Sequence, residues 1–320
     1  MEPPPDALFR GAFRRSTLIR NAVTEHELRG ALWRHPHHGR YTWSGTNPED
    51  PRQRILEAVS LLTDGCILGG WAAAFVHGAT DLDGRTWSGR LEPVLFVLPY
   101  RRRIQRAGIR PIRTPVALAD VVEIGGARVT APLRTCFDLM RLRTLEEAVV
   151  AADAMLRAKV VTVEGLADYV HQHTGWRGVG TARLAVDLAD SRAASCPESR
   201  LRVLWVVDAR LPRPQVNRPV FNPDGLLLGV PDLLDCESGL VGEYDGAVHR
   251  EPRRHAADNV REERLESHGL TVIRTTAIDL RQERRQTVRR LRDGYRRAMD
   301  RDRRYDRWTV DGPETPWLGS

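Results

Sequence analysis

Two short apolar segments on either side of Ser238-Gly239 constrain the fold of this chain more than any other feature. Apolar runs flanking a Ser-Gly break predict a β-hairpin. Asp232 lies in the first arm, and Glu243 and Asp245 close the second. Hairpin strands lie about 5 Å apart, and residues two apart share one face of a strand. We therefore expect these three carboxylates to converge at one end of the hairpin.

Carboxylates that converge in this way repel one another unless a cation lies between them. Mg²⁺ is the usual solution, held by a few carboxylates with water and phosphate oxygens. Asp232 is the leading candidate, because aspartate is depleted in strand interiors and costly to bury without a cation or a tight set of hydrogen bonds. Asp235 is expected to face the other side, in solvent. His249, on the loop that follows, could take a proton from an attacking water.

The composition is ordinary for a globular protein and allows two or three domains. Hydrophobic residues make up 41% and charged residues 28% of the 320 positions. No apolar run approaches the roughly 18 residues that cross a bilayer, and the start of the chain lacks the character of a signal peptide. Four scattered cysteines form no CxxC pair, which argues against a zinc ribbon. We expect a cytoplasmic protein with no membrane contact.

The net charge of +7 and the isoelectric point of about 9.7 suit a polyanionic partner, with DNA the natural candidate. Almost all of the basic residues are arginine, and Lys159 is the only lysine. Such a bias is more typical of a GC-rich genome than of selection for phosphate binding. Basicity alone therefore supports nucleic-acid binding only weakly, and no lysine lies near the carboxylates.

Residues 1–46 are expected to form a small winged-helix-like unit. Thr24 and Glu27 form a capping-box pattern that predicts a helix, and residues 33–43 predict a turn and a β-wing. In such a unit the helix enters the DNA major groove, and Arg40 of the wing is a candidate DNA contact. The histidines at 35, 37 and 38 could be metal ligands or solvated wing residues.

Residues 47–194 are expected to form an α+β middle region. Helical periodicity covers 52–63, 68–78, 135–142, 145–157, 163–173 and 178–189, and strand patterns cover 91–99, 109–113 and 127–129. His77, next to a glycine that ends a helix, suits a capping or core role better than catalysis. The region carries no nucleophile constellation, so a scaffold or recognition role is expected.

Residues 195–301 are expected to form the third domain, followed by a polar tail at 302–320. The predicted order is helix 197–209, strand 215–221, hairpin 226–245, helix 253–268, strand 270–275 and helix 278–301. This order predicts an α/β fold with a mixed sheet flanked by helices. Glu198, in the first turn of its helix, either compensates the helix dipole or adds a carboxylate near a metal. The charged helix 253–268 offers DNA contacts at Arg254, His255 and Arg261.

Several of these motifs together resemble the PD-(D/E)XK nuclease superfamily, and more narrowly the branch similar to very-short-patch repair endonucleases. The resemblance covers roughly residues 195–300. It lies in Glu198-Ser-Arg-Leu, Val230-Pro-Asp232, Glu243-Tyr-Asp-Gly246 with His249, Asp258 with Arg261, and Gly269-Leu-Thr-Val-Ile-Arg274. Residues 68–78, 129–138 and 178–190 are similar to actinobacterial proteins with an abortive-infection, type IV antitoxin-like N-terminal region.

The resemblance implies a restriction-endonuclease-like domain in which Asp232 and Glu243 coordinate Mg²⁺, or Mn²⁺ in its place, and Glu198 assists from its helix. His249 matches the histidine that lies beside the scissile phosphate in repair endonucleases. Asp245 stands where the superfamily usually has lysine, so it could serve only as a further ligand or base. The implied catalytic set is Glu198, Asp232, Glu243, Asp245 and His249.

Three functions remain open on the sequence. The first is metal-dependent hydrolysis of DNA phosphodiester bonds. The second is a DNA-binding regulator or antitoxin-like protein, with a toxin or other protein as a possible partner, whose nuclease-like domain is inactive. The third is an interaction scaffold with no nucleic-acid role.

Overall fold

The chain is a mixed α/β protein that divides into two compact units. The computed structural model describes residues 11–63, 65–99, 103–246 and 261–312. One unit comprises residues 1–142 and 158–182, and the other comprises residues 143–157 and 183–320. The boundary expected near residue 195 lies inside the second unit, which includes residues 183–194 and also helix α6 (Leu145–Arg157).

The first unit begins with two short helices and a β-hairpin. The elements are α1 (Arg15–Arg20), α2 (Glu25–Leu28), β1 (Trp33–Arg34) and β2 (Thr42–Trp43). The predicted capping box is present: Thr24 Oγ1 accepts the Glu27 N–H at 3.2 Å, and Glu27 Oε2 accepts the Thr24 N–H at 2.7 Å. Leu18, Leu28 and Trp33 form a small core. The helix at 24–29 and the hairpin that follows it agree with the prediction.

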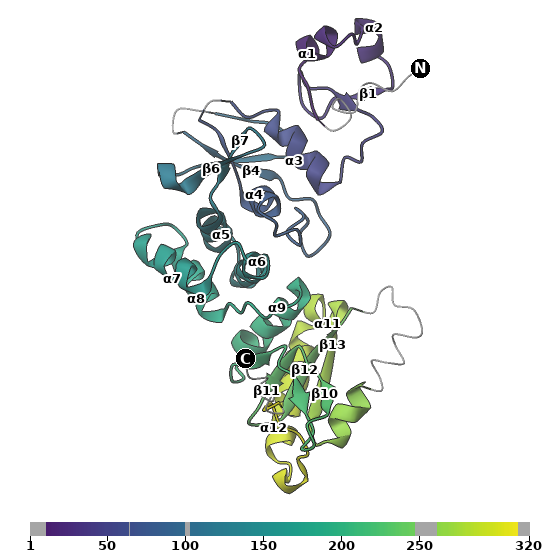
Figure 1. The fold of residues 1–320 in the computed structure, drawn as a ribbon, viewed down its shortest axis with the longest axis vertical. Coiled ribbons are helices and arrows are strands. Elements are labelled where there is room, and N and C mark those ends of the chain that lie inside the picture. Colours follow the sequence, from purple (N-terminus) through teal and green to yellow (C-terminus); the bar gives the residue numbers. More distant parts are fainter. Residues whose placement is uncertain (1–10, 64, 100–102, 247–260, 313–320) are drawn as a thin grey trace, which may run out of the picture. The chain divides into compact units, whose positions relative to one another are not determined.

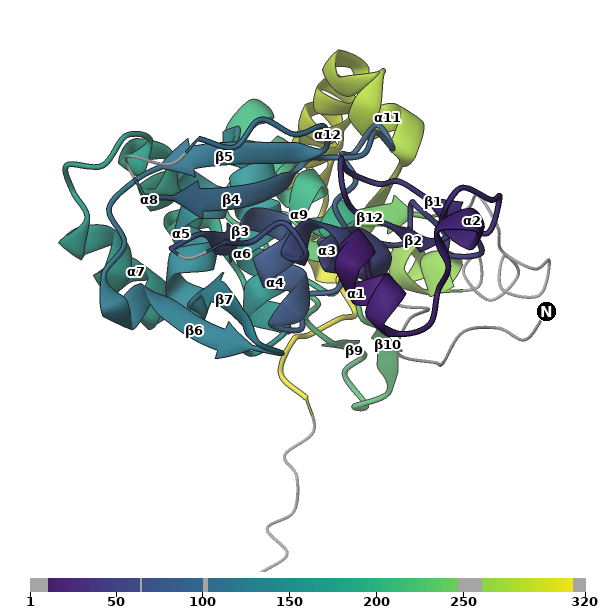
Figure 2. The ribbon, with the colours of Figure 1, turned by 90° about the horizontal axis from the view of Figure 1, so that it is seen from above.

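A five-stranded mixed sheet, in the order β5-β4-β3-β7-β6, is the centre of the first unit (Figure 2). Its strands are β3 (Ile67–Gly69), β4 (Val94–Leu98), β5 (Ile109–Arg113), β6 (Val121–Ile124) and β7 (Ala127–Thr130). The strands predicted at 91–99, 109–113 and 127–129 are confirmed, and β6 was not predicted. Every residue of β4 is buried, as its uninterrupted apolar sequence requires.

The prediction of one helix over residues 68–78 is wrong, because the segment is strand β3 followed by helix α4 (Gly70–Val76). Gly70 permits the change of direction: its φ is +61°, and a Cβ there would lie 2.9 Å from the Cβ of Leu95. His77 is the C-cap of α4, and its Nε2 hydrogen-bonds the Thr130 carbonyl at 2.7 Å. His77 thus ends α4, where a capping or core role was expected, and its side chain joins α4 to β7.

Helices pack around this sheet close to where the periodicity predicts them. They are α3 (Pro51–Val59), the short 3₁₀ turn η2 (Leu118–Asp120), α5 (Pro132–Arg141), α7 (Val163–Gln172) and α8 (Val179–Leu188), the last spanning the division between the units. The segment 129–138 forms a buried polar core: Arg134 donates to Asp138 at 2.8 Å and to Asp120 at 3.1 Å. Its guanidinium also stacks on Trp176. These groups stabilise the first unit from within.

Helix α6 belongs to the second unit because it packs on α9 (Cys196–Val203) around a buried ion pair. Arg202 donates to Asp153, and both side chains are almost fully buried. Asp153 Oδ1 also accepts the backbone N–H of Asp190 at 2.9 Å. Burial raises the pKa of Asp153, and Arg202 opposes that rise. The charges depend on each other, since either one alone would be buried unpaired.

The second unit contains a four-stranded mixed sheet in the order β13-β12-β11-β8 (Figure 1). Its strands are β8 (Gln215–Val216), β11 (Leu233–Asp235), β12 (Leu240–Asp245) and β13 (Thr271–Thr276). The hairpin predicted over 226–245 is confirmed for residues 233–245 as the antiparallel pair β11–β12, and β12 runs parallel to β13; residues 227–229 belong to a different strand pair. A separate antiparallel pair is made by β9 (Val220–Phe221) and β10 (Leu227–Gly229).

The remaining elements of this unit are helical. Helix α9 continues as one π-helical turn, η3 (Leu204–Asp208), and β13 is followed by α11 (Ala277–Arg281), α12 (Arg284–Met299) and a 3₁₀ turn, η4 (Arg303–Tyr305). The described part of the predicted helix 253–268 is helical over 261–267. None of the described helices has the length and apolarity needed to cross a membrane.

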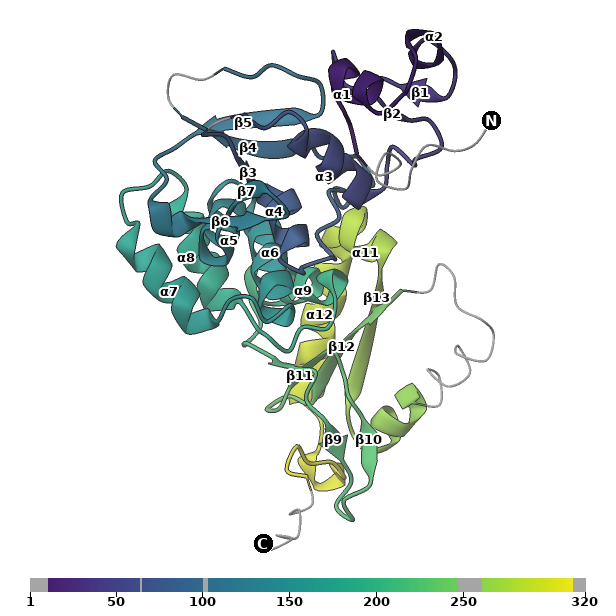
Figure 3. The same cartoon turned by 45° about the horizontal axis from the view of Figure 1, so that its top comes forward.

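The two faces of this sheet are covered differently (Figure 3). On one face, a Cβ at Gly242 would lie 3.0 Å from the ring of Trp205 in η3, and a Cβ at Gly294 in α12 would lie 3.0 Å from Ile273. On the other face, an apolar cluster joins the sheet to the β9–β10 pair and to segment 261–267; its buried members are Val220, Leu228, Leu234, Val241, Leu265 and Leu270. Because side chains alternate along a strand, successive residues of the sheet face the helices on one side and the apolar cluster on the other.

Candidate functional site

Asp232 and Glu243 lie opposite each other at the end of the β11–β12 hairpin. The antiparallel register pairs Leu233 with Gly242, and one further step of the same register sets Asp232 against Glu243. Residues opposite each other in an antiparallel pair point to the same face. That face is the one covered by segment 261–267, since Gly242 faces Trp205 on the other side.

Asp232 is half-buried and fixed by the neighbouring strand. Its Oδ2 accepts the backbone N–H of Tyr244 at 2.7 Å, and its carbonyl accepts the backbone N–H of Asn217 at 3.1 Å. Burial raises the pKa of the Tyr244 phenol, and the carboxylate of Asp245 adds to that rise. The hydrogen bond from Tyr244 supplies part of the compensation that a carboxylate in this position requires.

Glu243 is buried and ion-paired with Arg261. The backbone carbonyl of Glu243 accepts the Thr275 hydroxyl at 3.0 Å, which ties β12 to β13. The aliphatic stem of Arg261 passes over Gly229, where a Cβ would lie 3.3 Å from Arg261 Cγ. Arg261, expected to contact DNA, therefore reaches back to the sheet and neutralises one of the two predicted metal ligands.

Asp245 ends β12, where its register partner on β13 is Thr276. Its side chain is half-buried and makes no hydrogen bond or ion pair with any residue that the structure describes. Because residues 243 and 245 share a strand face, Asp245 extends the acidic surface begun by Asp232 and Glu243.

Glu198 is not gathered with these carboxylates. It lies on α9 and is buried, and it forms no metal-binding group with them among the described residues. Its Oε2 accepts the backbone N–H of Ala194 at 2.8 Å and an amide N–H of Asn217 at 2.9 Å. Asn217 in turn donates its own backbone N–H to the Asp232 carbonyl. Glu198 thus fixes the start of its helix and the loop beside Asp232.

Of the other predicted DNA contacts, only Arg40 lies among the described residues, and it has a structural role. Arg40 Nε and Nη2 donate to the Ser60 carbonyl at 2.9 and 2.6 Å. Ser60 is the C-cap of α3, so Arg40 satisfies a helix-terminal carbonyl. His249, Arg254 and His255 lie outside the described residues.

The donor chemistry suits Mg²⁺, because Asp232 and Glu243 are hard oxygen ligands that face each other across a hairpin. Two observations show that the site is not preformed for a metal. Arg261 already neutralises Glu243, and nowhere in the described ranges do three or more His, Cys, Asp or Glu side chains gather in a group that could hold an ion. Arg261 occupies Oε2 of Glu243, so a divalent cation that binds that oxygen would have to displace the guanidinium.

Asp235 corrects the expectation of a solvated side chain. It is buried, and its Oδ2 accepts both the backbone N–H of Ser238, at 2.9 Å, and the Ser238 hydroxyl, at 2.5 Å. The Asp235 carbonyl accepts the backbone N–H of Gly239 at 2.8 Å. Asp235 therefore builds the hairpin turn, as an aspartate at the start of a turn commonly does.

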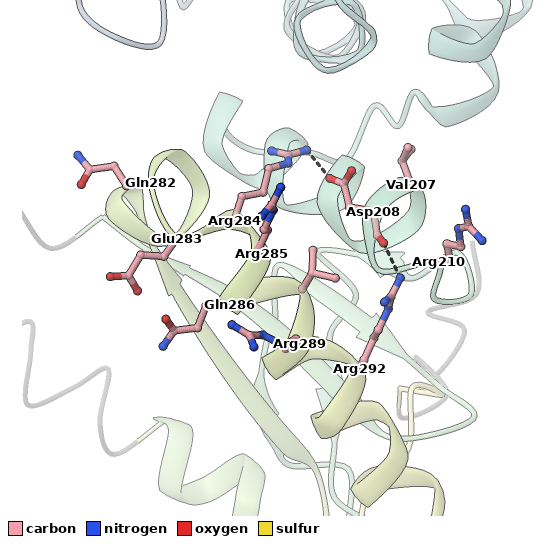
Figure 4. Close-up of a pocket in the computed structure, with 11 residues that line it drawn as sticks. Val207, Asp208, Arg210, Gln282, Glu283, Arg284, Arg285, Gln286, Arg289 and Arg292 are labelled. Carbon is pink, nitrogen blue, oxygen red and sulfur yellow. Dashed lines mark hydrogen bonds and ion pairs between the residues drawn. The ribbon is translucent and has the colours of Figure 1, made fainter.

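An arginine-lined groove in the second unit was not among the sites predicted from the sequence. The groove lies between α12 and the end of η3 (Figure 4). The signal in the sequence was the repetition of arginine at 285, 289 and 292, which helical spacing places on one side of α12.

The chain is similar to two uncharacterised proteins of Mycobacterium tuberculosis, one from strain CDC 1551 / Oshkosh and one from strain H37Rv. Each is 28% identical over 166 residues, which is 52% of this chain and 60% of the relative. The chain thus spans about three-fifths of the length of these curated relatives. No family model matches the chain, and no solved structure matches it.

Proposed function

We propose that the second unit is a restriction-endonuclease-like domain that hydrolyses DNA phosphodiester bonds with Mg²⁺ or Mn²⁺. The observation that carries this proposal is the hydrogen bond from the Tyr244 N–H to Asp232 Oδ2, which holds the Asp232 carboxylate at the end of β12 that carries Glu243. The mixed order β13-β12-β11-β8, with helices on one face and segment 261–267 on the other, is compatible with such a domain. We place this activity in the cytoplasm.

In this proposal Asp232 and Glu243 hold the cation, which when bound would lower the pKa of a water and neutralise charge on the phosphate. The hydrogen bond from Tyr244 orients the Asp232 carboxylate. Asp245, two residues beyond Glu243, supplies a further carboxylate that could hold a proton or assist as a ligand. Arg261 leaves Glu243 and becomes available to a phosphate oxygen, for which a guanidinium is well suited.

Nicking of supercoiled plasmid tests the proposal. Wild type should nick in Mg²⁺ or Mn²⁺ and not in EDTA. Asp232→Asn and Glu243→Gln should abolish nicking, while Asp232→Asn keeps an oxygen that accepts the Tyr244 N–H. Glu237→Gln, at an exposed position of the same hairpin turn, is the matched control and should nick like wild type. Equal cleavage by wild type, Asp232→Asn and Glu243→Gln would reject the proposal.

A second candidate function is DNA binding without cleavage, as in a regulator or antitoxin-like protein. The ion pair between Arg261 and Glu243 favours it, because the pair already satisfies a charge that a metal would otherwise neutralise. The winged-helix-like unit, in which α2 precedes the β1–β2 hairpin, would then supply the binding surface. This candidate predicts salt-sensitive binding with no nicking, and loss of that binding on deletion of residues 1–46.

A further inference from the structure

Arginine is the commonest residue in the lining of the groove between α12 and the end of η3 (Figure 4). It is open to solvent and has a volume of about 1130 Å³. All of its lining residues belong to the second unit. Its charged lining consists of five arginines and two acids: Arg210, Arg284, Arg285, Arg289, Arg292, Asp208 and Glu283. The groove therefore carries an excess of positive charge.

Two of the five arginines build the wall of the groove. Arg284 is ion-paired with Asp208 and, through Nη1, with Glu146 Oε2 at 2.6 Å. Arg292 donates to the backbone carbonyls of Asp208 and Ala209 at 2.9 and 3.0 Å (Figure 4). These contacts hold α12 against η3, so the groove has a fixed side.

The other three arginines are exposed, and none has a carboxylate partner within the described ranges. They are Arg210, Arg285 and Arg289. Arg285 and Arg289 stand one helical turn apart, which separates their Cβ atoms by about 5–6 Å. Gln282 and Gln286, at the same spacing, add amide donors to the lining. The groove thus presents charged and neutral hydrogen-bond donors to solvent, and its three exposed arginines have no carboxylate partner among the described residues.

Helix stability does not explain this arrangement. The N-cap of α12 is Glu283, but its first turn contains no acidic residue and begins with Arg284 and Arg285. The N-terminus of a helix carries a partial positive charge, so cations there are disfavoured. Positive side chains added to a positive helix end produce a local potential that attracts anions.

We propose that this groove binds the sugar–phosphate backbone of DNA. The inference rests on the proposed function, which makes DNA the substrate of the domain. Arginine, amide side chains and helix N-termini are among the groups that contact phosphates in protein–DNA complexes, and all three meet here. The groove lies in the same unit as the candidate site, on the face of the sheet that α12 and η3 cover.

The test measures binding of a fluorescent mixed-sequence DNA duplex by anisotropy, in EDTA and over a range of salt. Arg285→Gln with Arg289→Gln should weaken binding about tenfold or more and reduce the salt slope by about 0.9 for each phosphate that is no longer neutralised. The matched control is Arg296→Gln with Arg297→Gln, which removes the same charge from exposed positions of α12 outside the groove. The control pair should change affinity less than about twofold, since it leaves the groove intact.

Arg285→Lys with Arg289→Lys keeps the charge and should bind within about threefold of wild type, because the phosphate attraction is mainly electrostatic. Equal weakening by the groove pair and the control pair would overturn the inference, as would tighter binding of an RNA duplex of the same sequence. Failure of the proposed function is distinguishable: nicking would be absent in Mg²⁺ while the groove pair still weakened binding in EDTA. If wild type nicks normally but Arg285→Gln with Arg289→Gln binds DNA like wild type, the groove inference is wrong while the proposed function stands.

Discussion

Arg261 and Glu243 form an ion pair whose two members differ in their access to solvent. The side chain of Glu243 is 8% exposed, whereas that of Arg261 is 37% exposed. The carboxylate is therefore largely shielded from solvent, whereas the guanidinium that neutralises it is more accessible. Two roles of Glu243 are compatible with this pair. Glu243 is either a metal ligand that Arg261 neutralises in the absence of metal, or a structural carboxylate that Arg261 neutralises permanently.

Arg261→Gln separates these two roles. If Glu243 is a metal ligand, removal of the competing guanidinium should strengthen Mn²⁺ binding about tenfold or more, because a charge-assisted hydrogen bond contributes about 1.5–3 kcal/mol. Mn²⁺ affinity is measured by electron paramagnetic resonance, with Arg264→Gln, exposed on the same helical segment, as control. Unchanged or weaker Mn²⁺ binding with lower thermal stability would assign the pair a structural role.

Gly242→Ala should destabilise the second unit by about 1–3 kcal/mol, because a Cβ there would overpack the ring of Trp205. The Cβ would lie 3.0 Å from that ring. Gly180→Ala, in α8 with no atom within 4 Å of its Cβ, is the matched control and should be neutral or stabilising by up to about 1 kcal/mol. Urea unfolding measures both. Equal destabilisation by the two variants would contradict the packing argument.

Arg202→Leu should destabilise the protein by roughly 3–5 kcal/mol, because Asp153 would be left charged and buried without its partner. Arg296→Gln removes a surface pair in which the arginine is 74% exposed, and its effect should stay below about 0.5 kcal/mol. The measurement is the free energy of unfolding in denaturant at pH 7. A small effect of Arg202→Leu would show that α6 is held to α9 by apolar contacts alone.

The thermal stability of the first unit should fall as the pH drops below about 6.5. Burial lowers the pKa of His37, and Arg106, Arg40 and Arg34 act in the same direction while Glu57 opposes them. The unfolded chain therefore binds a proton in a pH range where the folded chain does not, so folding is favoured above the ordinary histidine pKa and less so below it. His37→Gln should flatten this pH dependence in calorimetry; an unaltered profile would point to another group.

The β11–β12 hairpin could be predicted because its signal is local: two apolar runs, a Ser-Gly break and an acid inside a strand. The ion pair between Glu243 and Arg261 could not, because it depends on where a helix 18 residues further along the chain returns to the sheet. The same limit applies to α6, whose periodicity gave its bounds but not its partner α9. The segment around Gly70 shows a different limit: its apolar run has the length of a helix, so the strand β3 that precedes α4 could not be told apart from it.

The close approach of Trp205 to Gly242 gives the second unit an intrinsic optical probe. The indole N–H of Trp205 donates to the Pro212 carbonyl at 2.8 Å, which fixes the ring over the strand that carries Glu243. A ligand that shifts β12 would alter the surroundings of this ring and hence its emission. With the other tryptophans replaced by phenylalanine, the fluorescence of Trp205 would report occupancy of the carboxylate end of the sheet without any attached label.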